Sequence, residues 1–297
     1  MTYLNKSRII NIIITILILV LIFMIGLLIL NLNHENTVEA GEKKLAEEQS
    51  QSRIEMIDIS EKETVFIPIL NFHHIKAAPA GVDSITASYY IEPQEFEEIL
   101  QSIIENDYEP VFVSEIVSYL LQKKLPKNKI IALTFDDGNA NYYTQAWPIL
   151  EKYQVKSNQY IMSGVKSENY MTHDQIKELA GTGLVEIGSH TVYHPYLTKE
   201  EGQLVIEELT KSQQVLKDLT GQSVGVLSYP FGLYDDRIKK LTAQNGYNAG
   251  LTYDQDGWQD PEDLYQLNRI SVFPGMNVVK YLEKLENNSG PDSNQTH

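Results

Sequence analysis

Two adjacent carboxylates, Asp136 and Asp137, directly follow the apolar run KIIALTF and precede Gly138. Two like charges at the end of a buried strand are costly unless a nearby group neutralises one of them. A divalent cation could bind one carboxylate and lower the pKa of a water molecule, and the second carboxylate could then act as the base. Considered alone, the Asp-Asp-Gly triplet is more simply explained as a turn or a helix cap.

A pair of histidines, His190 and His194, lies in the segment SHTVYHPYL. On a helical turn this spacing puts both imidazoles on one side, as in metal sites with two histidines. Pro195 disfavours a helix that continues through His194, so we expect a single turn or a loop. A His pair alone is more often two surface residues, but one carboxylate of the Asp pair would complete an Asp-His-His set with open positions.

The elements that must position these residues alternate between strand and amphipathic helix from Thr64 onwards. This alternation predicts an α/β fold with a parallel sheet. About seven such units favour a distorted (β/α) barrel of about seven parallel strands over an open sheet. The strands are expected at 64–72, 110–114, 129–135, 157–162, 184–189, 224–230, 247–253 and 267–273.

Capping signals predict where three of the helices begin. Ser114 can cap the helix that follows 110–114. Two capping boxes, Thr172-x-x-Gln175 and Thr198-x-x-Glu201, are each expected to open a later helix.

Polar and aromatic side chains follow four of the predicted strands. In parallel β/α folds the active site lies at the carboxyl ends of the strands. These residues should therefore converge on one mouth of the barrel: His73, His74, Asp136, Asp137, Ser189, His190, Tyr229, Pro230, Phe231 and Gly232.

The N-terminal region carries Lys6 and Arg8 ahead of an apolar run over residues 9–30. The run is long enough to span a bilayer as a helix. The preceding cations predict a cytoplasmic N-terminus and an extracellular remainder. We favour an uncleaved anchor over a signal peptide cleaved near Ala40, because the run is long for a signal core. The expected segments are a cytoplasmic tail (1–8), a transmembrane anchor (9–30), an extracellular stem (31–60), a folded domain (61–286) and a disordered tail (287–297).

Composition excludes several classes of protein. The chain has 297 residues, no cysteine and a formal net charge of -16. The lack of cysteine excludes disulfides, thiolate metal sites and a Cys nucleophile. The negative charge argues against nonspecific nucleic-acid binding. No Gly-x-Ser-x-Gly motif and no Gly-rich phosphate loop occurs, so a serine hydrolase and a nucleotide-binding protein are disfavoured.

Three linked motifs, LTFDDG, GSHTVYH and SYPFG, resemble those of the polysaccharide deacetylases of carbohydrate esterase family 4, the NodB-homology fold. The stretches PILNFHHI, LPKNKIIALTFDDG and LNRISV look most like the branch that removes N-acetyl groups from poly-β-1,6-N-acetylglucosamine, a biofilm polymer. The resemblance extends over about residues 64–285.

This resemblance implies roles for the Asp pair and the His pair. Asp136 would be the general base. Asp137, His190 and His194 would bind one divalent metal ion, usually zinc in this family, with nickel, cobalt, manganese or iron as alternatives.

The resemblance also implies substrate-binding residues. The backbone N–H of Phe231, where the family commonly has Tyr, would help to hold the oxyanion, and Tyr229 and Gly232 belong to the same motif. Trp258 resembles the aromatic wall on which the sugar sits, and the alternative is a loop residue packed on the rim.

The chain departs from the family pattern in two places. Many members have Arg ahead of the PY motif, paired with the catalytic Asp, whereas LSYPFG has none. Arg269 could reach that carboxylate from the last strand, or form a surface salt bridge. The usual late His, the general acid, is also missing. We assign this role to His73, which shares a strand face with Asn71, and expect His74 to pack in the wall. The alternative is that both are structural and Asp136 returns its own proton.

The resemblance implies a metal-dependent hydrolase that removes N-acetyl groups from a cell-surface N-acetylglucosamine polymer, with poly-β-1,6-N-acetylglucosamine preferred. The alternatives are a peptidoglycan N-acetylglucosamine deacetylase and a non-catalytic carbohydrate-binding module on the same fold. The expected partners are the extracellular glycan and, through the N-terminal helix, the lipid bilayer. No nucleic-acid partner is expected, the catalytic domain should lie outside the cell membrane, and the oligomeric state is left open.

Overall fold

The computed structural model describes residue 24 and residues 55–288, and all elements discussed here lie in the unit Met56–His297. The predicted anchor at 9–30, except Met24, and most of the predicted stem and tail lie outside the described residues. Within the described part of the chain, no helix has the length and apolar character needed to cross a membrane. Residues expected at the end of the stem form strand β1 (Met56–Asp58), which pairs with β7 (Lys124–Pro126).

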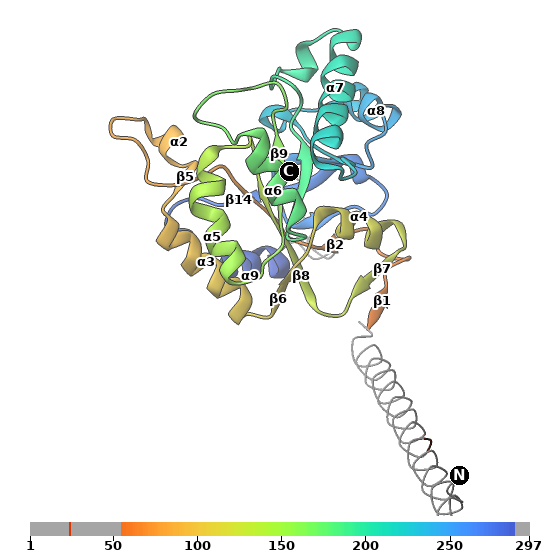
Figure 1. Ribbon diagram of the computed structural model, residues 1–297. Helices are drawn as coiled ribbons and strands as arrows, with labels where there is room; N and C mark the ends of the chain where they lie inside the picture. Colours follow the sequence, from red (N-terminus) through yellow and green to blue (C-terminus); the bar gives the residue numbers. More distant parts are fainter. Residues whose placement is uncertain (1–23, 25–54, 289–297) are drawn as a thin grey trace, which may run out of the picture. The chain divides into compact units, whose positions relative to one another are not determined.

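Seven parallel strands close into a ring (Figure 1). They follow one another around the ring in chain order, and pairing of the first strand with both the second and the last closes it. The barrel is distorted, because the register between the last two strands shifts. The prediction of a (β/α) barrel with about seven parallel strands is thus confirmed. The strands are β3 (Ile69–Phe72), β8 (Lys129–Phe135), β9 (Ser157–Ile161), β10 (Val185–Ser189), β11 (Val226–Ser228), β12 (Ala249–Gln255) and β14 (Leu267–Ser271).

Two of the predicted strands differ from the structure by more than one or two residues at their ends. The segment 64–72 is split by Ile67-Pro68 into β2 (Val65–Phe66) and β3, because proline has no N–H for a ladder. The strand expected at 110–114 lies earlier, as β6 (Tyr108–Pro110), which pairs with the start of β8. Two further small pairs are β2 with β13 (Trp258–Gln259) and β4 (His74–Ile75) with β5 (Tyr90–Ile91).

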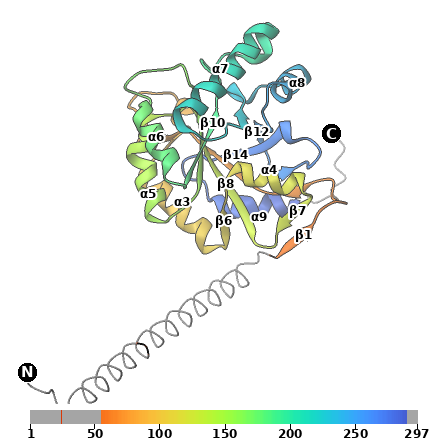
Figure 2. The same cartoon turned by 45° about the vertical axis from the view of Figure 1, so that its right-hand side comes forward.

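Helices lie outside the ring of strands, as Figures 1 and 2 show from two directions. The α-helices are α2 (Ser84–Ala87), α3 (Pro93–Glu105), α4 (Val113–Leu121), α5 (Trp147–Lys152), α6 (His173–Gly181), α7 (Gly202–Thr220), α8 (Asp236–Gln244) and α9 (Val278–Asn288). The short helices are η1 (Tyr142–Ala146), η2 (Leu197–Lys199), η3 (Pro230–Gly232) and η4 (Leu264–Gln266).

One of the three predicted helix starts is confirmed. Thr172 caps α6, and its backbone N–H in turn donates to the Gln175 side chain at 2.9 Å. The box at Thr198 is wrong, because Thr198 lies in η2 and α7 begins at Gly202. Ser114 is not a cap either. It lies inside α4, and its hydroxyl donates to Glu186 across the barrel end.

Alternate residues of β8 face two different environments, as expected for a barrel strand. Ile131 and Phe135 pack in the core between the strands and the outer helices. Ala132 packs in a second core with side chains from other barrel strands, such as Tyr160 and Leu251. Further along the same face, Thr134 and Asp136 are buried polar residues. The barrel interior therefore changes from apolar to polar toward the carboxyl ends of the strands.

Candidate active site

A cavity of about 380 Å³ lies at the carboxyl ends of the barrel strands. Residues from each of the four strand ends singled out by the sequence meet there, together with three from a segment after β4 and one from β12. The lining residues are His73, His74, Thr86, Tyr89, Tyr90, Asp136, Asp137, His190, His194, Tyr229, Phe231, Gly232 and Tyr253.

Asp137, His190 and His194 form a compact set of donors, with one donor atom from each residue lying within 4.8 Å of the others. Nε2 of His190 lies 3.5 Å from Oδ1 of Asp137. Nδ1 of His190 lies 2.8 Å from the carbonyl oxygen of Ser228, so Nδ1 carries the proton that it donates there. Nε2 therefore carries no proton, and its lone pair is available to bind a metal ion on the side where Asp137 lies. One carboxylate and two imidazoles suit a divalent ion such as zinc.

The loop that carries the two histidines is held by a buried carboxylate. Glu208, from α7, accepts hydrogen bonds from the backbone N–H groups of Val192 (2.7 Å) and Tyr193 (3.0 Å). Thr191 and His194 have φ values of 67° and 59°, in the left-handed region that residues other than glycine rarely adopt. The expectation of a loop rather than a helix is confirmed. The role of Glu208 in holding this loop could not be predicted from the sequence, because Glu208 is one of several acidic residues on a mainly polar helix.

Asp136 is buried beside Arg269, which comes from β14. The guanidinium donates to both carboxylate oxygens, Nη1 to Oδ1 at 2.9 Å and Nη2 to Oδ2 at 2.8 Å. The Ser228 hydroxyl donates to Oδ2 at 3.1 Å. Burial alone would raise the pKa of Asp136, but the charge of Arg269 lowers it well below its usual range. Asp136 is therefore ionised, and Arg269 forms the pair with this carboxylate rather than a surface salt bridge.

His73 lies between two tyrosines at the edge of the cavity, with its ring centre 4.9 Å from that of Tyr89 and 6.0 Å from that of Tyr253. Burial lowers the pKa of His73, and the charges of Asp136 and Asp137 oppose that effect. The side chain thus lies within the electrostatic reach of the Asp pair.

His74 is held in the wall. Its ring stacks on Tyr90 at 4.3 Å, and Nδ1 accepts a hydrogen bond of 3.1 Å from the Asn141 amide. Burial lowers the pKa of His74 to about 4. The two neighbours therefore differ in their contacts, but both line the cavity, and the assignment of the general acid to His73 stays a prediction.

The segment YPFG forms a tight turn in which Phe231 has φ 59° and Gly232 has φ 68°. A Cβ on Gly232 would lie 2.2 Å from Cβ of Tyr253, so only glycine fits against this neighbour. The Tyr229 side chain is fully buried, and its hydroxyl donates to the Tyr265 carbonyl at 3.0 Å. The Tyr229 side chain packs in the core, while the residue lines the cavity, so its assignment to substrate binding stays a prediction.

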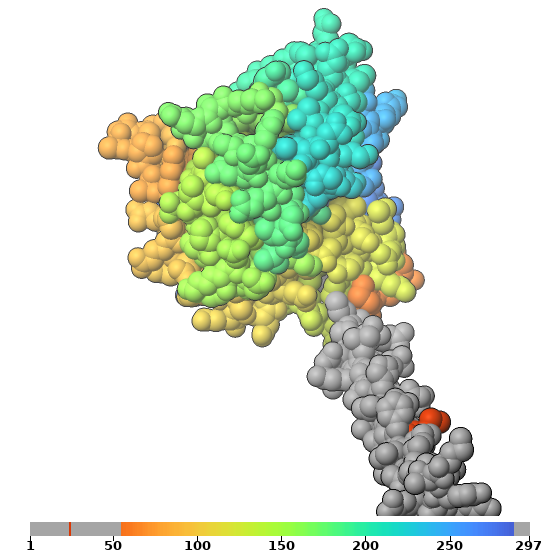
Figure 3. All heavy atoms as spheres, viewed as in Figure 1, coloured from red at the N-terminus to blue at the C-terminus, as the bar shows by residue number. Residues whose placement is uncertain are grey.

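Trp258 is absent from the lining of this cavity. It belongs to β13, and its ring packs against Phe66 at 5.4 Å. The assignment of Trp258 to an aromatic wall for the sugar stays a prediction. Thr86, Tyr89 and Tyr90 line the cavity instead, from a segment that includes helix α2. The orange part of the chain, which contains this segment, projects from the body in Figure 3. No motif in the sequence pointed to this segment.

The family model for polysaccharide deacetylase matches residues 123–250. The chain is 28% identical over 236 residues to YxkH of Bacillus subtilis, covering 79% of this chain and 81% of that protein. It is 25% identical over 227 residues to a poly-beta-1,6-N-acetyl-D-glucosamine N-deacetylase of Staphylococcus epidermidis, covering 68% and 78%.

Among solved structures, the Streptococcus pyogenes deacetylase PplD in complex with acetate superimposes with a TM-score of 0.69 at 29% identity. The match covers 74% of this chain and 98% of PplD. These findings agree with the motifs and the barrel, and the chain contains a polysaccharide deacetylase domain.

Proposed function

We propose that this protein is a metal-dependent N-deacetylase that acts on an extracellular N-acetylglucosamine polymer, with poly-β-1,6-N-acetylglucosamine as the first candidate. The observation that carries the proposal is the Asp-His-His set beside an arginine-held Asp136 in one cavity. The similarity to the S. epidermidis N-deacetylase supports the choice of polymer. The structure of PplD contains acetate, which is the small product expected of this reaction.

Asp137, His190 and His194 would hold one divalent ion, with zinc as the first candidate. The donor types and the hydrogen bond that directs Nε2 of His190 toward Asp137 support this fit. When bound, such an ion supplies Lewis acidity, which polarises an acyl carbonyl and lowers the pKa of water.

Asp136 would accept the proton of the attacking water at its carboxylate, and Arg269 would keep that carboxylate charged and oriented. The backbone N–H of Phe231 would donate to the oxyanion that develops on the acetamide oxygen. Both Asp136 oxygens retain lone pairs beyond the bonds from Arg269, so the carboxylate can still accept a proton.

The nitrogen of the leaving amine needs a proton before the carbon–nitrogen bond breaks, because an amide anion is a poor leaving group. We assign this step to the His73 ring, which lies in the cavity within reach of the field of the Asp pair. Burial lowers its pKa, so His73 would rest neutral. The proton that Asp136 takes from the attacking water would pass to this ring, which would then donate it to the amine nitrogen. Asp136 is the other group that could return the proton.

The proposed site of action is the outer face of the cell membrane. Lys6 and Arg8, followed by the apolar run 9–30, support an N-terminal anchor with the bilayer as a partner. Protease added to intact protoplasts should release the catalytic domain. Complete protection of the domain would contradict this orientation.

The test of the function is acetate release by the zinc-loaded protein from defined N-acetylglucosamine oligomers with β-1,6 or β-1,4 linkages. We expect release from the β-1,6 series, its loss after chelation, and recovery when zinc is returned. Faster release from the β-1,4 series would move the substrate to a cell-wall glycan. Tight oligomer binding without any acetate release would identify a carbohydrate-binding module instead.

A further inference from the structure

The two histidines of the Asp-His-His set are held in different ways. His190 donates from Nδ1 to the Ser228 carbonyl at 2.8 Å, which fixes the orientation of its ring. For the His194 ring, no hydrogen-bond partner is found among the residues that the structure describes. Its backbone N–H alone is bonded, to the Thr191 hydroxyl at 3.0 Å. The orientation of the second imidazole must therefore come from packing.

That packing is provided by a row of side chains that we call the aromatic column, made of His194, Phe231, Tyr196 and Lys199. The His194 ring lies 4.3 Å from Phe231 at an interplanar angle of 64°. Phe231 stacks on Tyr196 at 4.0 Å with an interplanar angle of only 5°. Nζ of Lys199 lies 4.3 Å from the centre of the Tyr196 ring. The column thus runs from a solvent-exposed cation to a candidate metal ligand.

The aromatic members of the column are unusual in their exposure. Phe231 is 46% exposed and Tyr196 is 41% exposed, so their rings do not serve the hydrophobic core. Because the Phe231 and Tyr196 rings are stacked in parallel at this separation, tilting the Phe231 ring out of the stack would make it collide with Tyr196. A restrained Phe231 in turn restrains His194, whose other neighbour is the fixed ring of His190 at 4.5 Å.

We propose that Tyr196 is a positioning residue for the metal centre. By stacking on Phe231, it holds the His194 imidazole in the orientation from which that ring binds the ion. The ring of Tyr196 performs this role rather than the hydroxyl, for which no hydrogen-bond partner is found in the described part of the chain. The inference rests on the proposed function for the presence of the ion, but it concerns a residue outside the family motifs.

The test compares zinc affinity, measured by competition with a chromophoric chelator, among three variants of the full chain. Tyr196→Leu removes the aromatic face, Tyr196→Phe keeps it, and Tyr193→Leu is the matched control. Tyr193 lies on the same loop and is 62% exposed, but it is not part of the column. Thermal unfolding of the metal-free proteins establishes that each variant is folded.

We expect Tyr196→Leu to weaken zinc binding about tenfold, the lower end of the effect of removing a residue that orients a metal ligand. Tyr196→Phe and Tyr193→Leu should stay within about twofold of the wild type. Because the defect lies in metal binding, saturating zinc should restore most of the acetate release by Tyr196→Leu.

Three results would overturn the proposal, and they separate it from the proposed function. Unchanged zinc affinity in folded Tyr196→Leu would remove Tyr196 from this role while the deacetylase proposal stood. Equal losses in Tyr196→Phe and Tyr196→Leu would show that ring stacking is not the cause. A wild-type protein that binds no zinc and releases acetate without any metal would instead overturn the proposed metal site itself.

Discussion

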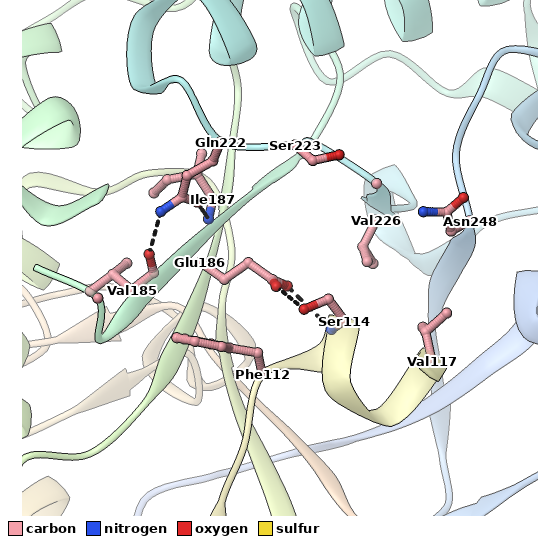
Figure 4. A pocket seen from close by; sticks show the side chains of 12 residues that line it. Phe112, Ser114, Val117, Val185, Glu186, Ile187, Gln222, Ser223, Val226 and Asn248 are labelled. Atoms are coloured by element: carbon pink, nitrogen blue, oxygen red, sulfur yellow. Dashed lines mark hydrogen bonds between the residues drawn. The ribbon is translucent and has the colours of Figure 1, made fainter. Parts of the chain in front are cut away.

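A carboxylate removed from solvent lies near each end of the barrel, and the two differ in their hydrogen-bond partners and in the direction of their pKa shifts. Asp136 lies at the carboxyl ends of the strands beside the candidate metal site. Glu186, from β10, lies at the opposite end in a second cavity of about 340 Å³, shown in Figure 4. The two cavities are similar in volume, so size alone does not mark the active site.

The difference lies in the partners of the two carboxylates. Asp136 receives two hydrogen bonds from the Arg269 guanidinium, and its pKa is lowered despite burial. Glu186 receives hydrogen bonds from the hydroxyl and the backbone N–H of Ser114, which carry no charge. Burial therefore raises the pKa of Glu186. Asp136 is thus paired with a buried cation where the proposed reaction needs a charged carboxylate, whereas the hydrogen-bond donors to Glu186 are uncharged and Lys156 only partly opposes the effect of burial.

The largest expected effect is on the rate of deacetylation, and it follows from removing the negative charge of Asp136. Asp136→Asn cannot accept the proton of the attacking water, so deacetylation should fall about 10²–10⁴-fold, roughly 3–5 kcal/mol of transition-state stabilisation. Zinc content should be unchanged, and Glu186→Gln, the same kind of change at the other end, should leave the rate unaltered. Acetate release at saturating substrate is the measurement. An Asp136→Asn rate within about twofold of wild type would exclude Asp136 as the base.

Removing the positive charge of Arg269 should lower the free energy of unfolding. Arg269→Met leaves Asp136 buried and unpaired, which should cost about 3–5 kcal/mol in the free energy of unfolding. Urea denaturation of the chelated protein measures this cost. The double variant with Asp136→Asn should recover part of the lost stability, since no unpaired charge remains. Equal losses in the single and the double variant would show that the unpaired charge is not the cause.

A smaller effect should distinguish the two neighbouring histidines at the carboxyl end. His73→Asn should lower deacetylation by at least about tenfold, because the leaving amine loses its proton donor. His74→Asn, which alters the wall but not the cavity chemistry, is the control. Both variants need verified zinc content and folding. If neither lowers the rate by more than about threefold, the proton comes from Asp136 or water.

The smallest effect concerns Glu186 and depends on pH. Its folded pKa is raised above the usual 4.5. Between those two values the folded state binds more protons than the unfolded state, so stability falls as pH rises through that window. Glu186→Gln removes this loss. The variant should therefore gain stability relative to wild type on going from about pH 4 to about pH 7, by roughly 1.4 kcal/mol for each unit of pKa shift. Denaturant midpoints at both pH values measure it, and a pH-independent difference would contradict the prediction.

Most of the barrel could be predicted from the sequence, because the period of apolar residues is local information. The run 129–135 is β8 with the expected bounds, and the capping box at Thr172 opens α6. The failures also have local causes. Pro68 interrupts a strand that composition alone predicted to be continuous, and Thr198 lies inside a 3-10 helix instead of opening α7. A capping pattern can satisfy more than one kind of turn, so the surrounding packing decides which one forms.

The sequence by itself determined which residues make up the candidate active site of this protein. Asp136, Asp137, His190 and His194 follow strands whose apolar pattern is unambiguous, and parallel strands must deliver their carboxyl ends to one mouth. Motif residues are few in type and fixed in spacing, so they can be recognised without coordinates.

Only the tertiary structure decided how those residues are held. Arg269 meets Asp136 across 133 residues of chain, and Glu208 reaches the histidine loop from the face of a helix. Tyr196 stacks on Phe231, whereas Trp258 packs outside the cavity. Such contacts depend on the closure of the ring and the angle of each helix against it. Those quantities arise from the sum of many packing interactions, and no short stretch of sequence encodes them.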